Sequence, residues 1–316
     1  MDLANAVALA KIADSGQSVS SRLFTSPRGQ TRLDGAIVSI AYLLNPLTIA
    51  ACLGRSTSIF TNAAIIHAVY SAITGDTFRA MFALALASYL SMYPILLFPP
   101  LALLCWDRAV QRSDKKLQGL TMFIHLIASL FACINGLLWL SFIVMGGSWE
   151  FLSATYGFHL SVPDLTPNVG LWWYFFIEIF DSFREFFLGT FWLHLAAYVG
   201  GLTLRLRRQP LFVITTLLGI FAIFKPYPSI SDVSLYLAFV PLYKHVFPRK
   251  SFPLEPWAKL IDSSHALYFH CHVGIAVCEF TRASVLSSLD LCGIRERKLL
   301  LCHYPGLESG TFNAGG

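Results

Sequence analysis

Three carboxylates at helical spacing are the residues of this sequence with the clearest capacity for chemistry. Glu178, Asp181 and Glu185 stand at positions i, i+3 and i+7, so a helix would present them on one face. Carboxylates grouped in this way can act as a general acid and base or as metal ligands. They can also belong to an interfacial helix that turns its acids to water or to arginines of a partner. We favour the interfacial interpretation, because an Asp at the centre of a membrane helix costs about 2.5–3.5 kcal/mol.

Aromatic residues occupy the opposite face of the same expected helix. Thr166 and Pro167 suit its N-cap and its first helical position. Four phenylalanines then follow at i, i+4, i+7 and i+11, which places them in one stripe: Phe176, Phe180, Phe183 and Phe187. The spacing predicts an amphipathic helix with rings on one side and acids on the other.

Two further groups lie in the same stretch, residues 148–187. Asp164 and Asn168 flank the prolines of its loop. They could hydrogen-bond sugar hydroxyls or a phosphoethanolamine amine, or they could stabilise turns. The remaining rings could stack on a glycan, but a belt at the membrane interface is the interpretation we favour; these rings are Trp149, Trp172, Trp173 and Tyr174.

No catalytic constellation is recognisable in the sequence. It contains no P-loop, no G-x-S-x-G and no H-E-x-x-H motif. The histidines and cysteines of the C-terminal part fit no common zinc spacing: His270, Cys271, His272, Cys278, Cys292, Cys302 and His303. We therefore expect no catalytic residue, no metal site and no cofactor.

The composition places these residues in a membrane protein. Of the 316 residues 55% are hydrophobic and only 13% are charged, and the mean hydropathy is +0.60, whereas soluble domains carry about 25% charged residues. The net charge of +5 comes without a basic cluster, so we expect no nucleic-acid partner. The expected fold class is all-α, a polytopic integral membrane helical bundle.

Prolines divide the long apolar segments. Residues 36–53 are interrupted by Asn45 and Pro46, which predicts a kink. Residues 77–106 contain Pro94, Pro99 and Pro100 and read as one kinked helix or as two short ones. Two full crossings do not fit comfortably, since a spanning helix needs about 20 residues.

The positive-inside rule orients the second half of the chain but conflicts with the first half. Basic residues put segments 107–116, 205–209 and 244–250 in the cytosol, and segments 146–170 and 225–232 in the lumen. Arg22, Arg28 and Arg32 also favour the cytosol. However, counting three crossings back from residues 107–116 puts them in the lumen. Segment 77–106 is the expected source of this conflict.

Four segments together resemble the PIG-U family, a multispanning subunit of the glycosylphosphatidylinositol (GPI) transamidase of the endoplasmic reticulum. They are YLLNPLTIAACLGRST, ALASYLSMYPILLF, GSWEFLSATYGFHLSVPDLTPNVGLWWYFFIEIF and FAIFKPYPSISDVSLYLAFVPL. The resemblance covers about residues 34–247. The same landmarks resemble the GPI mannosyltransferases more weakly, which implies a GT-C-like architecture.

The resemblance also implies a division of the chain. We expect a polar N-terminal segment with a short helix at residues 1–33, a multispanning PIG-U-like membrane domain at 34–247, and a divergent, poorly ordered tail at 248–316. The opening DLANAVAL is similar to the end of a later family helix, so we expect the chain to be truncated at its N-terminus relative to the family.

The function implied by the resemblance is that of a non-catalytic accessory subunit in a multi-pass protein of the endoplasmic reticulum membrane. It would bind and present the GPI lipid, with catalysis in the cysteine-protease-like PIG-K and with PIG-T, PIG-S and a GAA-type subunit as further partners. The candidates for contact with GPI or membrane lipid are Asp164, Asn168, Trp172, Tyr174, Phe175, Phe176, Glu178, Phe180, Asp181 and Phe183. The alternative is a GT-C-type mannosyltransferase, but the acidic motif of the first luminal loop in that class is missing here.

Overall fold

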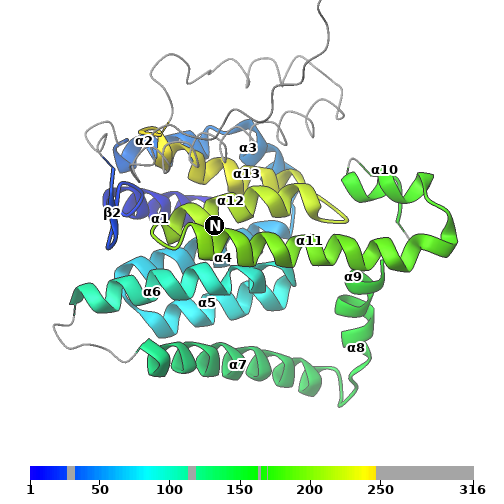
Figure 1. The fold of residues 1–316 in the computed structure, drawn as a ribbon. Coiled ribbons are helices and arrows are strands. Elements are labelled where there is room, and N and C mark those ends of the chain that lie inside the picture. Colours follow the sequence, from blue (N-terminus) through cyan, green and yellow to red (C-terminus); the bar gives the residue numbers. More distant parts are fainter. Residues whose placement is uncertain (27–32, 113–118, 163–164, 169, 247–316) are drawn as a thin grey trace, which may run out of the picture.

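The described part of the chain is helical except for one small hairpin (Figure 1). The computed structural model describes residues 1–26, 33–112, 119–162, 165–168 and 170–246. Strands β1 (Ser20–Ser21) and β2 (Phe24–Thr25) pair antiparallel, with Ser20 opposite Thr25. The helices are α1 (Asp2–Asp14), α2 (Gly35–Leu43), α3 (Pro46–Leu53), α4 (Ser58–Thr74), α5 (Thr77–Leu90), α6 (Phe98–Arg112), α7 (Gly119–Val144), α8 (Glu150–Leu152), α9 (Phe158–Ser161), α10 (Leu171–Glu178), α11 (Arg184–Arg205), α12 (Pro210–Phe224) and α13 (Ile230–Phe239). Shorter 3-10 turns lie at Tyr93–Leu97, Asp181–Phe183 and Val240–Tyr243, and a π-turn at Ser153–Gly157.

Helix α12 forms the centre of the bundle. It is apolar on every side and almost completely buried, which is the pattern of a helix surrounded by other helices. Pro210 opens it at a position where the missing N–H costs nothing. Helices α6, α11 and α13 contact it. Helix α1 packs against α2 and α4 through buried Leu9 and Ile12, so residues on both sides of the expected boundary at residue 34 share one core.

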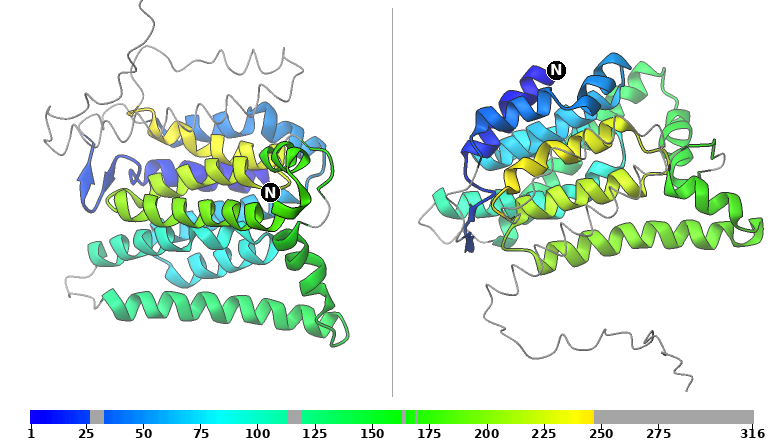
Figure 2. Two further views of the ribbon diagram at one scale, coloured as in Figure 1. Left: turned by 45° about the vertical axis from the view of Figure 1, so that its right-hand side comes forward. Right: turned by 90° about the horizontal axis from the view of Figure 1, so that it is seen from above.

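The long helices run back and forth between two ends of the bundle (Figures 1 and 2). At the end that we call the basic end, the hairpin meets the end of α6 and the α11–α12 connection. Arg22 forms an ion pair with Asp107 at 2.9 Å, and the Ser21 hydroxyl donates to the carbonyl of Arg208. At the opposite end, which we call the cavity end, the start of α4, the end of α5 and the α12–α13 connection surround a polar cavity.

The orientation conflict disappears in this arrangement. The chain reverses at the 3-10 turn Tyr93–Leu97, so α5 and α6 are separate passes in opposite directions (Figure 1). Between Gly35 and Arg112 the chain therefore passes the bundle four times, along α2 with α3, then α4, α5 and α6. The count of three crossings is wrong. It assumed that each crossing needs about 20 residues, whereas α5 makes a separate pass with only 14 residues. Arg22 consequently lies at the same end as Arg208.

The helices have the lengths and surfaces of a membrane helical bundle. Three helical segments are long and apolar enough to cross a membrane: Tyr93–Gln111, Gly119–Val144 and Asp181–Arg205. The pair α2 and α3 adds a fourth if it counts as one bent span. That pair bends by 49°, which confirms the expected kink, and Asn45 caps α3 by accepting the Leu47 N–H at 2.9 Å.

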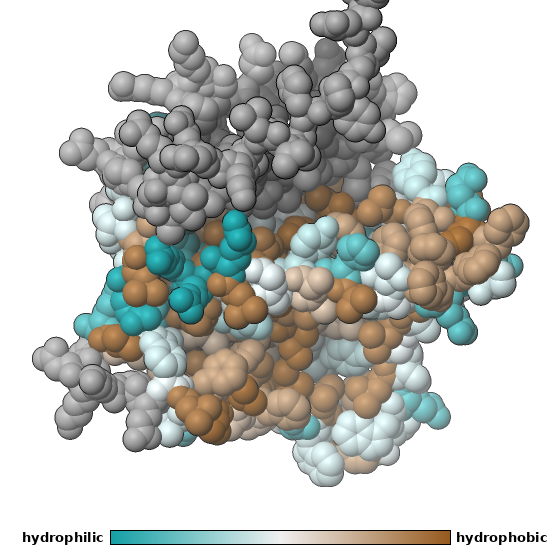
Figure 3. Space-filling view, viewed as in Figure 1, coloured by the Kyte–Doolittle hydropathy of each residue, from teal (hydrophilic) through white to brown (hydrophobic). Residues whose placement is uncertain are grey.

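Helix α7 carries much of the exposed apolar surface. It packs mainly against α5 and exposes large side chains such as Ile124, Phe131 and Leu140 along its outer side. The same face of the molecule is largely hydrophobic in the space-filling view (Figure 3). An exposed surface of this kind suits contact with lipid. The expected tail at 248–316 lies outside the described residues.

Candidate functional site: a polar cavity beside an aromatic rim

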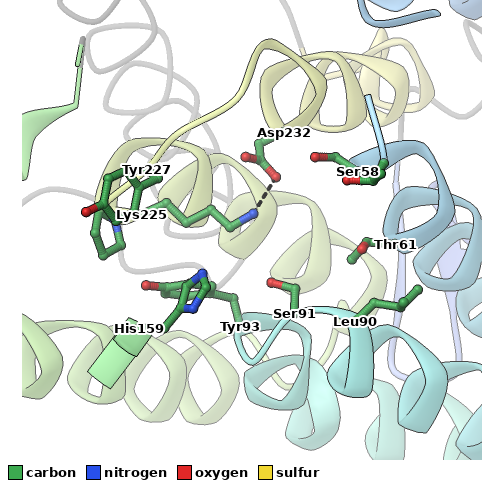
Figure 4. Close-up of a pocket in the computed structure, with 11 residues that line it drawn as sticks. Ser58, Thr61, Leu90, Ser91, Tyr93, His159, Lys225, Tyr227 and Asp232 are labelled. Atoms are coloured by element: carbon green, nitrogen blue, oxygen red, sulfur yellow. Dashed lines mark hydrogen bonds and ion pairs between the residues drawn. The ribbon is translucent and has the colours of Figure 1, made fainter. Parts of the chain in front are cut away.

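A polar cavity of about 240 Å³ opens at the cavity end (Figure 4). Helix α4, the α5–α6 turn, α9 and the α12–α13 connection each contribute to its wall. Hydroxyl groups dominate its lining, and they belong to Thr57, Ser58, Thr61, Ser91, Tyr93 and Tyr227. Figure 4 shows Lys225 and Asp232 facing Ser91 and Thr61 across the space. The cavity can therefore offer hydrogen-bond donors and acceptors from several directions.

An ion pair forms one wall of the cavity. The Lys225 ammonium lies 2.8 Å from a carboxylate oxygen of Asp232, and the two side chains are only 17% and 14% exposed. The ammonium also lies over the ring of Tyr93, 5.6 Å from its centroid. Such a pair is held where water screens it poorly, so the loss of one partner would strand the other.

The local sequence explains how this pair is positioned. Helix α12 ends at Phe224, and the next residues include Pro226 and Pro228, which cannot continue a helix. Ser229 then caps α13 in a capping box with Asp232. The second carboxylate oxygen of Asp232 accepts the Ser229 N–H at 3.0 Å and its hydroxyl at 2.9 Å. Asp232 thus fixes the start of α13 and the lysine at once.

Tyr93 closes the inner side of the cavity. Its side chain is 2% exposed, and its ring stacks on Trp192 of α11 at 5.6 Å with an angle of 15°. Its hydroxyl has no hydrogen-bond partner in the part of the chain that the structure describes. A buried hydroxyl without a partner costs about 1–3 kcal/mol, so the contacts of its ring, and not its hydroxyl, hold Tyr93 in place.

The outer wall is the α8–α9 segment. His159 lines the cavity from α9, and the neighbouring Phe158 stacks on Tyr227 with 6.0 Å between centroids. Tyr156 donates from its hydroxyl to the Tyr89 carbonyl at 2.7 Å, and burial raises the pKa of Tyr156. Arg184 donates to the Val162 carbonyl at 2.6 Å, which ties this wall to the start of α11.

Residues 171–187, which we call the aromatic rim, do not form the single helix that the spacing predicts. Helix α10 ends at Glu178, Phe180 is extended, and α11 begins at Arg184 after the 3-10 turn. Helix α10 folds back on α11, since the rings of Phe175 and Phe191 lie 5.1 Å apart. In a continuous helix, residues 16 positions apart would be about 24 Å apart. The shared phenylalanine stripe and the shared carboxylate face are therefore not formed.

The start of α10 also differs from the prediction. Gly170, and not Thr166, stands at the N-cap, and the helix begins at Leu171. The side-chain oxygen of Asn168 accepts the Gly170 N–H at 2.7 Å. The side-chain nitrogen of Asn168 donates to the Pro226 carbonyl at 3.3 Å. This tertiary contact holds the loop in a turn that local sequence preference does not specify.

Two of the residues singled out from the sequence contact the segment that lines the cavity. Trp172 is fully buried and donates from its indole N–H to the Phe224 carbonyl at 2.7 Å. Asn168 reaches Pro226 of the same segment. Phe175 and Phe176 are half-buried in the ring cluster with Phe191. These residues support the cavity from behind and do not line it.

The other singled-out residues are exposed at the rim. Phe180 is 78% and Phe183 is 54% exposed, and Tyr174, Glu178 and Asp181 are exposed as well. None of the described rim residues lines the cavity. Asp164 lies outside the described residues. The structure therefore separates the candidates into buried supports and an exposed aromatic and acidic edge.

The sequence reasoning missed the cavity residues. Lys225 and Asp232 lie seven residues apart in one stretch, but Tyr93 comes from a distant part of the chain. One local signal was present, because the stretch KPYPSISD combines two prolines with the S-x-x-D pattern of a capping box. That pattern predicts a helix start, but it does not predict which groups meet there.

A family model described as GPI transamidase subunit PIG-U matches residues 1–263, which extends the resemblance beyond residues 34–247 on both sides. The GPI-anchor transamidase component PIGU of Homo sapiens is 39% identical over 211 residues, covering 66% of this chain and 48% of the human protein. The GPI transamidase component GAB1 of Saccharomyces cerevisiae is 34% identical over 219 residues, covering 68% of this chain and 52% of the yeast protein. The chain thus spans about half the length of these relatives. It belongs to the PIG-U family of GPI transamidase subunits.

Proposed function

We propose that this chain acts as a non-catalytic membrane subunit of the GPI transamidase and binds and presents the GPI lipid. Family membership supports a place in that complex, since its relatives are named as transamidase components. The proposed location is the endoplasmic reticulum membrane, and the proposed architecture is GT-C-like. Catalysis belongs to PIG-K in this proposal, with PIG-T, PIG-S and a GAA-type subunit as the other partners.

One observation carries the lipid-presenting role: a polar cavity and an exposed aromatic edge lie at the same end of the bundle. A glycosylphosphatidylinositol has a polar head and apolar tails, so its receptor needs both kinds of surface in close succession. The 224–226 segment connects them, because Lys225 lines the cavity while Phe224 and Pro226 accept hydrogen bonds from Trp172 and Asn168.

Individual roles follow from exposure. Phe180 and Phe183 are exposed and are proposed to contact acyl chains or a neighbouring subunit. Glu178 and Asp181 are proposed to face the polar head or a partner. The side-chain oxygen of Asn168 accepts from Gly170 and its side-chain nitrogen donates to Pro226. Its proposed role is therefore to position the loop behind the cavity.

Complementation tests the proposal. The chain is expressed in cells that lack their own PIG-U, and GPI-anchored proteins at the surface are counted by flow cytometry. We expect restored display, and we expect Glu178→Ala to lower GPI loading of the complex while co-precipitation of PIG-T stays unchanged. Glu150→Ala, which removes an exposed acid of α8, is the matched control.

Two results would contradict the proposal. If the chain is expressed but restores no surface display, it is not a functional subunit. If the Glu178→Ala variant displays GPI-anchored proteins normally, the acidic edge has no part in presenting the lipid.

A further inference from the structure

We propose that the basic end of the bundle carries a binding surface for anionic phospholipids, formed by the α11–α12 connection and the β-hairpin beside it. The partner is the membrane leaflet that borders this end, and the group recognised is the phosphate of an acidic headgroup such as that of phosphatidylserine. This surface lies at the end of the bundle opposite the cavity. The inference goes beyond the proposed function and does not depend on it.

The α11–α12 connection concentrates positive charge. Residues 205–209 read RLRRQ and contain three arginines and no acid. Arg205, Arg207 and Arg208 are all exposed. Arg205 and Arg207 form no ion pair with any residue that the structure describes. Because a guanidinium group matches the geometry of a phosphate, these two side chains suit an anion that comes from outside the chain.

The hairpin is fixed beside these arginines. The Ser21 hydroxyl donates to the carbonyl of Arg208, and Figure 1 shows the hairpin at the end of the bundle where α11 and α12 connect. The Asp107 carboxylate at the end of α6 is only 6% exposed and is paired with Arg22 at 2.9 Å. Asp107 therefore balances the charge of Arg22 and leaves the charge of the connection in place.

Exposed apolar side chains at the edge of this surface place it at a membrane. Leu204 is 77% exposed and directly precedes Arg205, where a helical segment long and apolar enough to cross a membrane ends. Leu23 in the turn of the hairpin is 48% exposed. Figure 3 shows hydrophilic side chains grouped at this end, next to hydrophobic surface. Arginines that follow the apolar part of a span lie at the depth of the headgroups.

This combination favours a lipid over a soluble acidic partner. An anionic phospholipid presents a phosphate and acyl chains together, so it can meet the arginines and the neighbouring leucines at once. A soluble acidic molecule would meet only the arginines. Basic residues beside the end of a span are attracted to anionic leaflets by the same electrostatic force.

Arg207→Gln is the sharpest variant for a test. Arg207 lies beyond the end of α11, so the loss of its charge leaves the helix intact. Arg205→Gln is added in a double variant, since Arg205 stands in the last turn of α11, where a cation also complements the helix dipole. Arg79→Gln is the matched control, because Arg79 is exposed at the same end but is paired with Asp76 at 3.5 Å. Arg207→Lys keeps the charge.

The experiment uses native mass spectrometry of the full chain in detergent with equimolar phosphatidylserine and phosphatidylcholine. We expect the wild-type chain to bind phosphatidylserine in preference. The ratio of phosphatidylserine to phosphatidylcholine adducts should fall about fivefold in Arg207→Gln, as for one arginine lost from an anionic surface, and further in the double variant. Arg207→Lys should retain the preference, and Arg79→Gln should leave it unchanged. Higher salt should weaken the preference, because exposed charges are screened.

Four outcomes would overturn the inference. The first is no preference for phosphatidylserine in the wild-type chain, and the second is full preference in the double variant. The third is an equal loss in Arg207→Gln and Arg79→Gln, which would assign the preference to overall charge. The fourth is displacement of phosphatidylserine by glycerophosphoserine, which lacks acyl chains, at equal concentration. Surface display of GPI-anchored proteins is not part of this measurement, so failure of the lipid surface and failure of the proposed function are distinguishable.

Discussion

The cavity and the aromatic rim lie side by side at one end of the bundle, yet they are built in opposite ways. The rim is one contiguous stretch, and its acids and several of its rings face outward. The cavity takes one or a few residues from each of four regions of the chain and holds its charged pair largely away from solvent. The residues with the most conspicuous spacing thus lie at the surface, while the polar groups that the fold encloses have no conspicuous spacing.

This difference has an energetic side. An exposed carboxylate changes the free energy of unfolding little. A buried ion pair is different, because removal of one partner leaves the other charge buried and unpaired, which destabilises the fold strongly. The two regions should therefore respond very differently to truncation.

The largest effect is expected for Trp172→Ala. Trp172 is fully buried and donates to the Phe224 carbonyl at 2.7 Å. Its loss leaves a large void and an unsatisfied carbonyl, and should lower the free energy of unfolding by about 3–5 kcal/mol. Thermal unfolding of the full chain in nanodiscs measures this. Trp173→Ala is the control. Because Trp173 is only half-buried, this substitution should lower the free energy of unfolding clearly less. Equal losses for both would show that α10 is not anchored through Trp172.

A slightly smaller decrease in the free energy of unfolding is expected for Asp232→Ala. The substitution strands the Lys225 ammonium and removes the cap of α13, and breaking a buried pair costs about 3–5 kcal/mol. We expect the lower part of that range because both side chains keep some exposure. Asp181→Ala removes an exposed acid of the rim and should leave the unfolding temperature unchanged. A rim variant as damaging as the cavity variant would erase the contrast between the two regions.

The smallest effect on stability is expected for Phe180→Ala. Phe180 is 78% exposed, so the free energy of unfolding should change by no more than about 0.5 kcal/mol. Surface display of GPI-anchored proteins should nevertheless fall in the complementation assay if this ring meets lipid or a partner. The control is Phe131→Ala, which removes a ring that is 66% exposed on α7, a helix outside the rim. Normal display with Phe180→Ala would remove this ring from the proposed lipid contact.

The sequence by itself determined the class of the protein and several local features. Low charge and long apolar runs specify a membrane bundle, and Asn45–Pro46 specifies a bend, which the structure has at 49°. These properties depend on composition or on neighbouring residues, and both can be read along the chain. The segments YLLNPLTIAACLGRST and FAIFKPYPSISDVSLYLAFVPL likewise pointed to the family that the comparisons establish.

Only the tertiary structure decided where the rim breaks and what the cavity contains. Helical spacing predicted a continuous helix through Asp181, but packing of Phe175 on Phe191 and the hydrogen bond from Arg184 to Val162 favour two helices folded together. The number of passes before Arg112 was likewise decided by the reversal at Tyr93–Leu97. The physical reason is the same in each case: periodicity describes contacts within one helix, whereas the meeting of Tyr93 with Lys225 depends on how whole helices pack.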